Sequence, residues 1–309
     1  ATSKPGAGSS SERRPADDGV PMSGPAIVGW DVDLGGVRIR LLRAGRFRTD
    51  AGALFGPVPR ILWEPLVRDE LDALDRIWVA ANCLLVETAD RRVLVESGLG
   101  DLDPATADRI GFEGSTVEGA LAEVGLGPGD VDLVILSHLH TDHAGGIGDA
   151  TGGLRFPRAS VVVQAAELAI ALRRNARLAM AYDQPRLRPL VDRLSASAVD
   201  GDVEILPGLF VVRTGGHSGG HQVVVVRGRD GVCCFAGDLT PRPWAANPRW
   251  ITTYDDFPLT SVARKAALFR RAAAEGWLVV CSHEPTAPVG RLVAERDRYR
   301  FEPLAAEPA

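Results

Sequence analysis

Three of the six histidines in this chain fall within six residues, at His138, His140 and His143, and Asp142 lies among them. Imidazole and carboxylate groups are the ligands that a borderline cation such as Zn²⁺ prefers. A loop that leaves a strand can aim alternating side chains at two adjacent metal positions. We therefore interpret this cluster as metal-binding, because its spacing is hard to explain as a polar turn whose histidines only satisfy one another.

The elements around the cluster must hold it in place. The continuous apolar run at residues 131–137 directly precedes His138 and is typical of a strand buried on both faces. Before that run, Ser115 and Glu118 form a capping-box pattern, which predicts a helix that Gly125 ends. The cluster is therefore expected to begin where a buried strand ends.

Alternating and continuous apolar patterns predict further strands along the whole chain. They lie from Val37 onward (VRIRLL), in a hairpin of 82–87 and 92–96, and at 160–163, 203–206, 209–214, 222–227, 232–236 and 277–281. Helices are predicted around 165–181 and 261–275. Many strands with helices at intervals indicate sheet layers covered by helices.

Two segments rich in aromatic residues are predicted to be irregular. Residues 52–65 are broken by glycine and proline and contain Phe55 and Trp63, which predicts a loop or lid. The acidic stretch 69–75 after it is predicted to be helical. Residues 244–257 are loop-like, and their aromatic residues fit a substrate wall or a part of the core equally well: Trp244, Trp250, Tyr254 and Phe257.

The composition is that of an ordinary globular chain, with 45% hydrophobic and 24% charged residues. The 35 Lys and Arg against 40 Asp and Glu leave a net charge of -5 without a long basic run, so a nucleic-acid partner is not expected. The longest apolar runs are strand-sized and far below the about 18 residues of a membrane helix. We therefore expect no membrane partner.

Cysteine usage and the N-terminal composition bear on compartment and domain organisation. Cys83, Cys233, Cys234 and Cys281 lie in apolar runs without a CxxC spacing, which favours buried free thiols over a disulfide, and a cytoplasmic location. Residues 1–25 are rich in Ser, Gly, Pro and charge and lack the apolar region of a secretory signal. We predict a disordered tail at 1–25 and a single domain at 26–309.

The stretch SHLHTDHAGG at residues 137–146 resembles the H-x-H-x-D-H signature of the metallo-β-lactamase-fold superfamily. Three further matches follow in the order of that family: His217 in TGGHSGGH, Asp238 in CFAGD and His283 in VVCSHE. The resemblance implies an α/β fold, a four-layer αβ/βα sandwich of two mixed sheets covered by helices.

The same resemblance implies two divalent metal ions, with Zn favoured and Mn or Fe as alternatives. It divides the ligands into one group for each ion and one bridging carboxylate: His138, His140 and His217; Asp142, His143 and His283; and Asp238 as the bridge. His221 matches the second His of the family's turn motif and is expected to support a ligand rather than bind metal.

The implied mechanism is hydrolysis. A hydroxide shared by two cations would attack the substrate, and one metal would stabilise the negative charge that develops on the attacked oxygen. Asp142 is the expected catalytic residue, because a carboxylate inside the cluster can pass a proton to the leaving oxygen.

Segments 53–64, 82–101 and 248–260 resemble the branch that holds N-acyl-homoserine lactonases and methyl-parathion-hydrolase-like enzymes. One departure is Glu96, where the family often has Asp, which puts the geometry around the ligands in doubt. The leading hypothesis is hydrolysis of a small lactone or ester, with the substrate chosen by the loops 55–63 and 244–257.

Other activities suit the same ligand set. A phosphotriester, thioester or β-lactam offers a comparable electrophile, and a mono-iron dioxygenase acting on a thiol or persulfide is a different class on the same fold. A nuclease is disfavoured by the acidic balance, and a non-catalytic metal-binding module is disfavoured by the complete ligand set. We expect a small-molecule substrate and leave a homodimer open.

Overall fold

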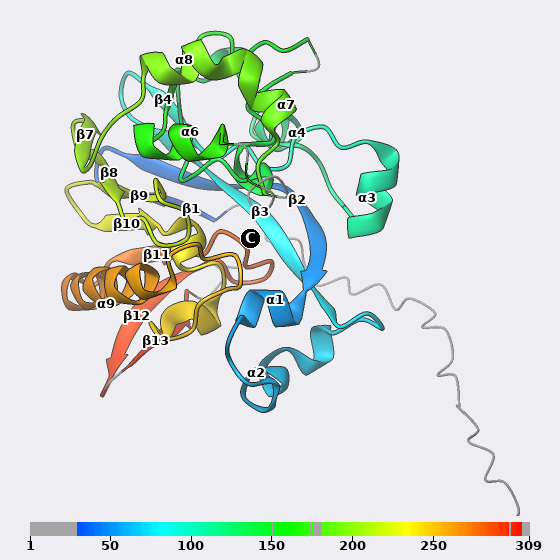
Figure 1. The fold of residues 1–309 in the computed structure, drawn as a ribbon. Coiled ribbons are helices and arrows are strands. Elements are labelled where there is room, and N and C mark those ends of the chain that lie inside the picture. Colours follow the sequence, from blue (N-terminus) through cyan, green and yellow to red (C-terminus); the bar gives the residue numbers. More distant parts are fainter. Residues whose placement is uncertain (1–29, 150, 174, 176–180, 297, 305–309) are drawn as a thin grey trace, which may run out of the picture.

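The computed structural model describes residues 30–149, 151–173, 175, 181–296 and 298–304. Two β-sheets face each other, and helices cover their outer sides (Figure 1). The tail predicted at 1–25 lies outside the described residues, as do residues 26–29 at the start of the expected domain. Both domain bounds therefore remain predictions.

The first sheet has six strands in the order β1-β2-β3-β4-β5-β6. Strands β1 to β4 pair antiparallel, whereas β4, β5 and β6 pair parallel, so the sheet is mixed. Their bounds are β1 Asp31–Asp33, β2 Arg38–Asp50, β3 Arg76–Glu87, β4 Arg92–Val95, β5 Leu133–Ile135 and β6 Ser160–Val162. The β3–β4 hairpin confirms the prediction.

The second sheet has seven strands in the order β13-β12-β11-β10-β9-β8-β7. Only β10 and β11 pair parallel, so this sheet is mixed too. Their bounds are β7 Val203–Leu206, β8 Leu209–Arg213, β9 Gln222–Arg227, β10 Val232–Phe235, β11 Leu278–Val280, β12 Val289–Glu295 and β13 Arg298–Pro303. The predicted strands β7 to β11 are confirmed, and the charged β12–β13 hairpin was not predicted.

The helical bounds complete the architecture. The α-helices are α1 Ala51–Phe55, α2 Arg60–Val67, α3 Pro104–Ile110, α4 Val117–Glu123, α5 Thr141–Ala144, α6 Ala165–Ala171, α7 Gln184–Leu187, α8 Val191–Ala196 and α9 Pro258–Glu275. The 3₁₀-helices are η1 Arg68–Glu70, η2 Pro128–Asp130, η4 Arg188–Leu190, η5 Gly237–Leu239 and η6 Pro243–Ala246.

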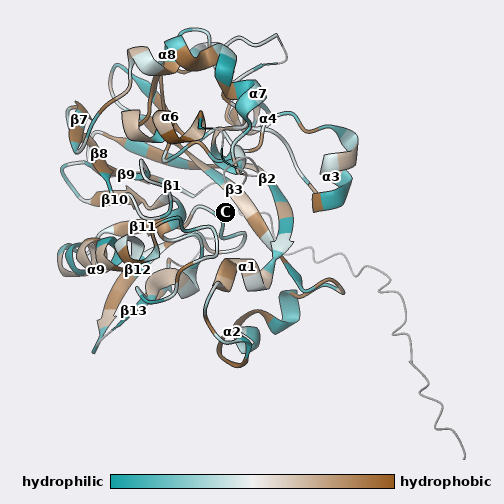
Figure 2. Cartoon of the chain, in the orientation of Figure 1, coloured by the Kyte–Doolittle hydropathy of each residue, from teal (hydrophilic) through white to brown (hydrophobic). Residues whose placement is uncertain are grey.

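Apolar side chains form one core between the sheets and one beneath each helical layer. Residues such as Ile39, Leu84 and Val224 pack between the two sheets. The outer face of the first sheet packs against α4, α6 and α8, and that of the second packs against α9. The hydrophobic colouring of the strands follows this arrangement (Figure 2). The expected four-layer sandwich of two mixed sheets is thus confirmed.

The predictions for residues 52–75 were wrong. Segment 52–65 is helical rather than a loop, because the Asp50 carboxylate caps α1 by accepting a hydrogen bond from Ala53 N at 2.7 Å, and α2 follows Pro59. Residues 69–75, predicted to be helical, form only the short η1. The Asp72 side chain then accepts hydrogen bonds from Leu74 N and Arg76 N, which ends the helical geometry.

Two helix boundaries also differ from the predictions. Helix α4 begins after Thr116 without a side-chain cap, because Glu118 forms an ion pair with Arg155 instead of a capping box with Ser115. Helix α6 ends at Ala171 instead of continuing to 181, and residues 174 and 176–180 lie outside the described part.

The surface and the cysteines bear on two further predictions. All four cysteines are buried and free, as expected. Within the described residues, no helix is both long and apolar enough to cross a membrane.

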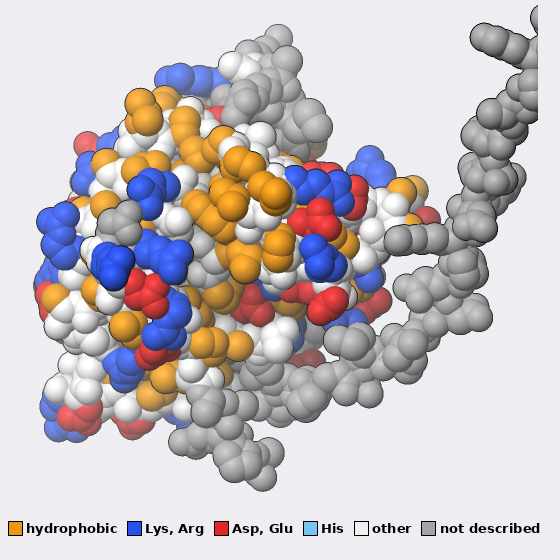
Figure 3. All heavy atoms as spheres, turned by 90° about the horizontal axis from the view of Figure 1, so that it is seen from below, with side chains coloured by type: hydrophobic (Ala, Val, Ile, Leu, Met, Phe, Trp, Pro, Cys, Tyr) orange, Lys and Arg blue, Asp and Glu red, His pale blue; other side chains and the backbone are white. Residues whose placement is uncertain are grey.

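Hydrophobic side chains gather on the face of the molecule that is seen from below in Figure 3, and helix α2 lies at this end of the molecule in Figure 1. On α2, Ile61 is 81% exposed and Leu62 and Leu66 are each 55% exposed. The homodimer stays a prediction.

Candidate metal centre

The seven predicted ligands come from four separate segments that meet at one edge of the two sheets. His138 and His140 follow β5, and Asp142 and His143 lie on α5. The other three are His217 between β8 and β9, Asp238 in η5 after β10, and His283 after β11. The structure therefore brings together every side chain that the sequence pattern assigned to the site.

The first group consists of His138, His140 and His217, whose ligand atoms lie within 4.8 Å of one another. The Nε2 atom of His217 is 3.1 Å from Nδ1 of His140. Two nitrogens that bind one tetrahedral Zn²⁺ at its usual bond length lie about 3.3 Å apart. This spacing is therefore suited to a single shared ion.

The second group consists of Asp142, His143 and His283, again with ligand atoms within 4.8 Å of one another. The two Nε2 atoms of His143 and His283 are 3.1 Å apart. The Oδ2 atom of Asp142 lies 3.4 Å from His283 Nε2 and 3.8 Å from His143 Nε2. These atoms could hold a second ion.

Asp238 lies between the two groups and presents one oxygen to each. Its Oδ2 is 3.3 Å from His217 Nε2, in the first group. Its Oδ1 is 3.2 Å from His143 Nε2 and 3.0 Å from His283 Nε2, in the second group. A carboxylate with its two oxygens directed to different sites has the geometry of a bridging ligand.

The surroundings of one buried nitrogen, His138 Nε2, indicate whether these residues suit a metal. His138 is fully buried, and its Nδ1 lies 2.9 Å from Ser137 Oγ, while its Nε2 has no hydrogen-bond partner. An unpartnered buried polar atom costs about 1–3 kcal/mol. Coordination of a cation by Nε2 removes this cost, so the residues fit the expected metal.

The pKa values differ between the two groups. Burial lowers the pKa of His138, His140 and His217, which keeps these rings neutral and ready to bind a cation. Burial acts in the same direction on His143 and His283, but the Asp238 and Asp142 carboxylates outweigh it and raise both pKa values. Metal binding to the second group must therefore displace protons.

Glu96 supports the second group. Its Oε1 accepts a hydrogen bond from Ser137 N at 3.0 Å, and its Oε2 forms an ion pair of 3.6 Å with His143 Nδ1. Its backbone has φ 69°, a left-handed conformation that is costly for a residue other than glycine. The longer acid thus contacts both the backbone at the end of β5 and the side chain of His143.

Replacing Glu96 with glutamine is expected to weaken metal binding by the second group about 10- to 100-fold, because the charge beside His143 Nδ1 is lost while the shape is kept. Stepwise zinc titration against a chromophoric chelator measures this affinity. Wild-type affinity for both ions in Glu96→Gln would show that the carboxylate does not support His143.

His221 has the supporting role expected for it. Its Nε2 accepts a hydrogen bond from Asp238 N at 3.1 Å, so its protonated Nδ1 donates to Thr214 Oγ1 at 2.7 Å. Burial lowers the pKa of His221 to about 3, which keeps the ring neutral. Both nitrogens are engaged, so the ring fixes the backbone of Asp238 rather than binding a cation.

Sequence reasoning missed Asp255, which lies beside His217. Its Oδ1 is 3.9 Å from His217 Nδ1 and accepts a hydrogen bond from Ser261, while its Oδ2 accepts from Thr252 N at 2.8 Å. Gly216 permits this packing, because a Cβ there would lie 2.5 Å from Ser261 Oγ. The only sequence signal was the acidic pair Asp255–Asp256, which precedes helix α9 in a segment rich in aromatic residues.

The aromatic segments divide between core and surface. Phe55 and Trp63 are buried and stack with ring centroids 5.0 Å apart, and Trp244 packs against Phe55 at 4.3 Å. Phe55 and Trp63 therefore do not form an exposed substrate loop. Tyr254 and Phe257 are 42% and 50% exposed and remain accessible to a ligand.

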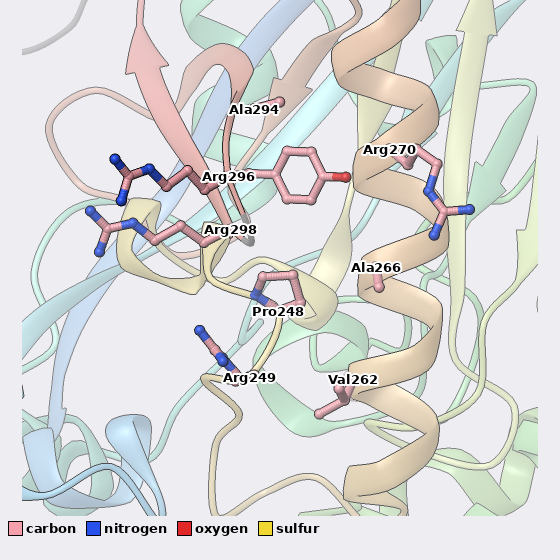
Figure 4. Close-up of a pocket in the computed structure, with 9 residues that line it drawn as sticks. Pro248, Arg249, Val262, Ala266, Arg270, Ala294, Arg296 and Arg298 are labelled. Atoms are coloured by element: carbon pink, nitrogen blue, oxygen red, sulfur yellow. The ribbon is translucent and has the colours of Figure 1, made fainter.

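Two surface pockets are lined by residues other than the seven candidate ligands. One, of about 350 Å³, lies between α9 and the β12–β13 hairpin and is lined by several arginines and Tyr299 (Figure 4). The other, of about 600 Å³, is lined by the glycine turn before His217 and by Phe257. The second pocket borders the candidate metal centre through that turn.

Residues 76–283 match the Metallo-beta-lactamase superfamily family model, which is more than half of the chain. The chain therefore belongs to the metallo-beta-lactamase superfamily.

Individual relatives agree with this assignment. An N-acyl homoserine lactonase of Bacillus thuringiensis is 32% identical over 158 residues, which are 47% of this chain and 57% of the lactonase. The match thus spans little more than half the length of that relative. A probable metal-dependent hydrolase from Staphylococcus aureus has a similar structure, with a TM-score of 0.78, 25% identity, and coverage of 88% of this chain and 99% of that one.

The dizinc quorum-quenching lactonase AidC, solved with its product, has the same fold. Its TM-score is 0.76 with 19% identity, and the match covers 90% of this chain and 97% of AidC.

Proposed function

We propose that this protein is a dinuclear metal-dependent hydrolase that acts on a small lactone or ester. The observation that carries the proposal is the position of Asp238, with one oxygen facing each group of ligands. Membership of the superfamily and the similarity to an N-acyl homoserine lactonase support the hydrolytic activity and the substrate class.

The chain's own residues define where the ions would bind. His138, His140 and His217 would hold one ion, and Asp238 would connect it to the second. Asp142, His143 and His283 would hold that second ion. Two bound divalent cations supply a water of near-neutral pKa and an electrophile for the attacked oxygen. Zinc suits this set of imidazoles and carboxylates best, with manganese or iron as alternatives.

Asp142 is the proposed proton carrier. Its side chain is 29% exposed, whereas those of His143 and His283 are 2% and 5% exposed. A carboxylate at the boundary between the ligands and solvent can accept a proton on the oxygen that does not bind the ion and deliver it to the oxygen of a leaving group. The accessible Tyr254 and Phe257 offer aromatic surface to the organic part of a substrate.

The same ligand geometry bears on the alternative activities. A phosphotriester, thioester or β-lactam presents an electrophile that this site could also attack. A mono-iron dioxygenase requires only one ion, and the presence of a second complete group favours two ions over one.

Removal of the metal is expected to abolish hydrolysis, and two zinc-like ions per chain should restore it. Metal content by mass spectrometry and kcat/KM across lactones, aryl esters, thioesters and phosphotriesters test the metal and the substrate separately. One iron per chain with oxygen uptake would contradict the hydrolase, whereas two ions with no lactone or ester turnover would contradict only the substrate class.

A further inference from the structure

Glu167 is a buried carboxylate for which the proposed hydrolysis has no use. It lies on α6 in the apolar sequence AAELAIA, and it is completely buried. A buried charge is costly unless hydrogen bonds or opposite charges compensate for it. The identity of its partners therefore indicates what the carboxylate is for.

Each oxygen of Glu167 accepts two hydrogen bonds. Oε1 accepts from Leu139 N at 3.1 Å and from the Tyr182 hydroxyl at 2.9 Å. Oε2 accepts from the Ser218 hydroxyl at 2.5 Å and from Gly220 N at 3.1 Å. All four donors are neutral, and Glu167 acts as a four-bond acceptor.

Three of these donors belong to the two loops that carry the first ligand group. Leu139 lies between His138 and His140, while Ser218 follows His217 directly. The fourth donor, Tyr182, packs its ring against that of His140 with centroids 4.7 Å apart. Glu167 therefore contacts both sides of the first group without touching a ligand nitrogen.

The approach of the glycine turn to α6 is too close for a side chain. A Cβ on Gly220 would lie 2.2 Å from Glu167 N, and one on Gly219 would lie 2.4 Å from Ile170 Cδ1. The turn that carries His217 is thus seated directly on α6. Burial and the neighbouring Glu167 raise the pKa of Tyr182, so its hydroxyl stays protonated as a donor.

We propose that Glu167 is a positioning residue that fixes the loop of His138 and His140 at a set distance from the turn of His217, and thereby shapes the first metal site. The carboxylate of Glu167 accepts hydrogen bonds from both Leu139 N and Gly220 N, which lie 81 residues apart in sequence. The inference rests on the proposed function, because it assigns the first group to an ion.

Glu167→Gln tests this role with a side chain of nearly equal shape that can accept at one position only. Its amide would direct N–H groups at two of the four donors. We expect the affinity for one of the two ions to fall about 10- to 100-fold, with the other ion unaffected. Glu167→Asp keeps the charge but is too short for all four bonds, and we expect it to lose affinity as well.

The measurement is stepwise Zn²⁺ binding to the metal-free full chain in competition with a chromophoric chelator, together with the absorption spectrum of the Co²⁺-loaded protein. The spectrum reports the coordination geometry and does not depend on turnover. Glu123→Gln, an exposed glutamate on α4, is the matched control and should behave as wild type. Tyr182→Phe and Ser218→Ala remove one bond each and should weaken the same ion to a smaller degree.

Wild-type affinities and an unchanged Co²⁺ spectrum in Glu167→Gln would overturn the proposal, as would an equal loss at both ions. If Glu167→Gln does not fold, Tyr182→Phe and Ser218→Ala decide: a loss at one ion supports the proposal, and no loss overturns it. A wild-type protein that binds fewer than two ions would instead overturn the proposed function, and this inference with it.

Discussion

Asp238→Ala is expected to lower kcat/KM for the substrate by about 10³-fold or more and to reduce the metal content from two ions per chain to one. The carboxylate is the only side chain whose oxygens face both ligand groups in the described structure. Without it, two cations would lie close together with no negative charge between them. Metal binding by the second group would weaken most, because Asp238 contacts both His143 and His283.

Metal analysis and steady-state kinetics on the same preparation measure both effects. Asp238→Asn separates charge from shape, because its amide presents an oxygen to one group only, and we expect it to keep a single ion. Asp108→Ala, an exposed residue on α3, is the control. Retention of two ions and near-normal kcat/KM in Asp238→Ala would show that the bridging assignment is wrong.

Arg242→Ala is expected to lower the free energy of unfolding by about 3–5 kcal/mol. Arg242 is buried, and its Nε donates to Glu284 Oε2 at 2.9 Å, while Nη1 and Nη2 donate to Glu70 at 2.8 and 3.0 Å. Burial opposes the charge, but Glu284 and Glu70 outweigh it and raise the pKa of Arg242. Removing the guanidinium would leave Glu284, which is 5% exposed, without its ion-pair partner.

Chemical denaturation monitored by tryptophan fluorescence measures this change. Arg158→Ala breaks an exposed ion pair with Asp132 and should cost no more than about 1 kcal/mol. The double variant Arg242→Met with Glu284→Gln should recover part of the stability, because it also removes the buried charge that has lost its ion-pair partner. A loss below about 1 kcal/mol in Arg242→Ala would show that solvent reaches Glu284 and that the pair is not buried in solution.

Arg242 also connects the site to η1, which follows the segment 52–65 that was predicted to be a loop or lid. Through Glu70 it holds η1, and through Glu284 it holds the residue next to His283. The helices α1 and α2 are therefore anchored to the structure around the ligands, with Phe55 and Trp63 in a core. This arrangement explains why the loop prediction failed: glycine and proline suggested irregular structure, but tertiary burial of the aromatic rings stabilised two short helices.

Strand positions and the cluster at His138–His143 could be predicted because they depend on local patterns. Apolar runs such as 131–137 and 222–227 indicate burial directly. The residues His138, His140, Asp142 and His143 carry their chemistry in their types and their spacing. The β12–β13 hairpin was harder to predict. Strand β12 (VGRLVAE) interrupts its apolar residues with a glycine and charged residues, and β13 (RYRFEP) alternates charged with aromatic residues, so neither strand shows a continuous apolar run.

The sequence by itself indicated the metal-binding cluster at His138–His143, because residue type and short spacing carry that signal, and its resemblance to a known family implied the other three candidate ligands and the class of chemistry. Only the tertiary structure decided that the two oxygens of Asp238 face different ligand groups. It also decided that Glu96 and Asp255 lie beside candidate ligands and that Glu167 binds the loops that carry them. Such contacts join residues that are distant in sequence: Leu139 lies 28 positions and Ser218 lies 51 positions from Glu167. No local pattern specifies which distant backbone will approach a given carboxylate.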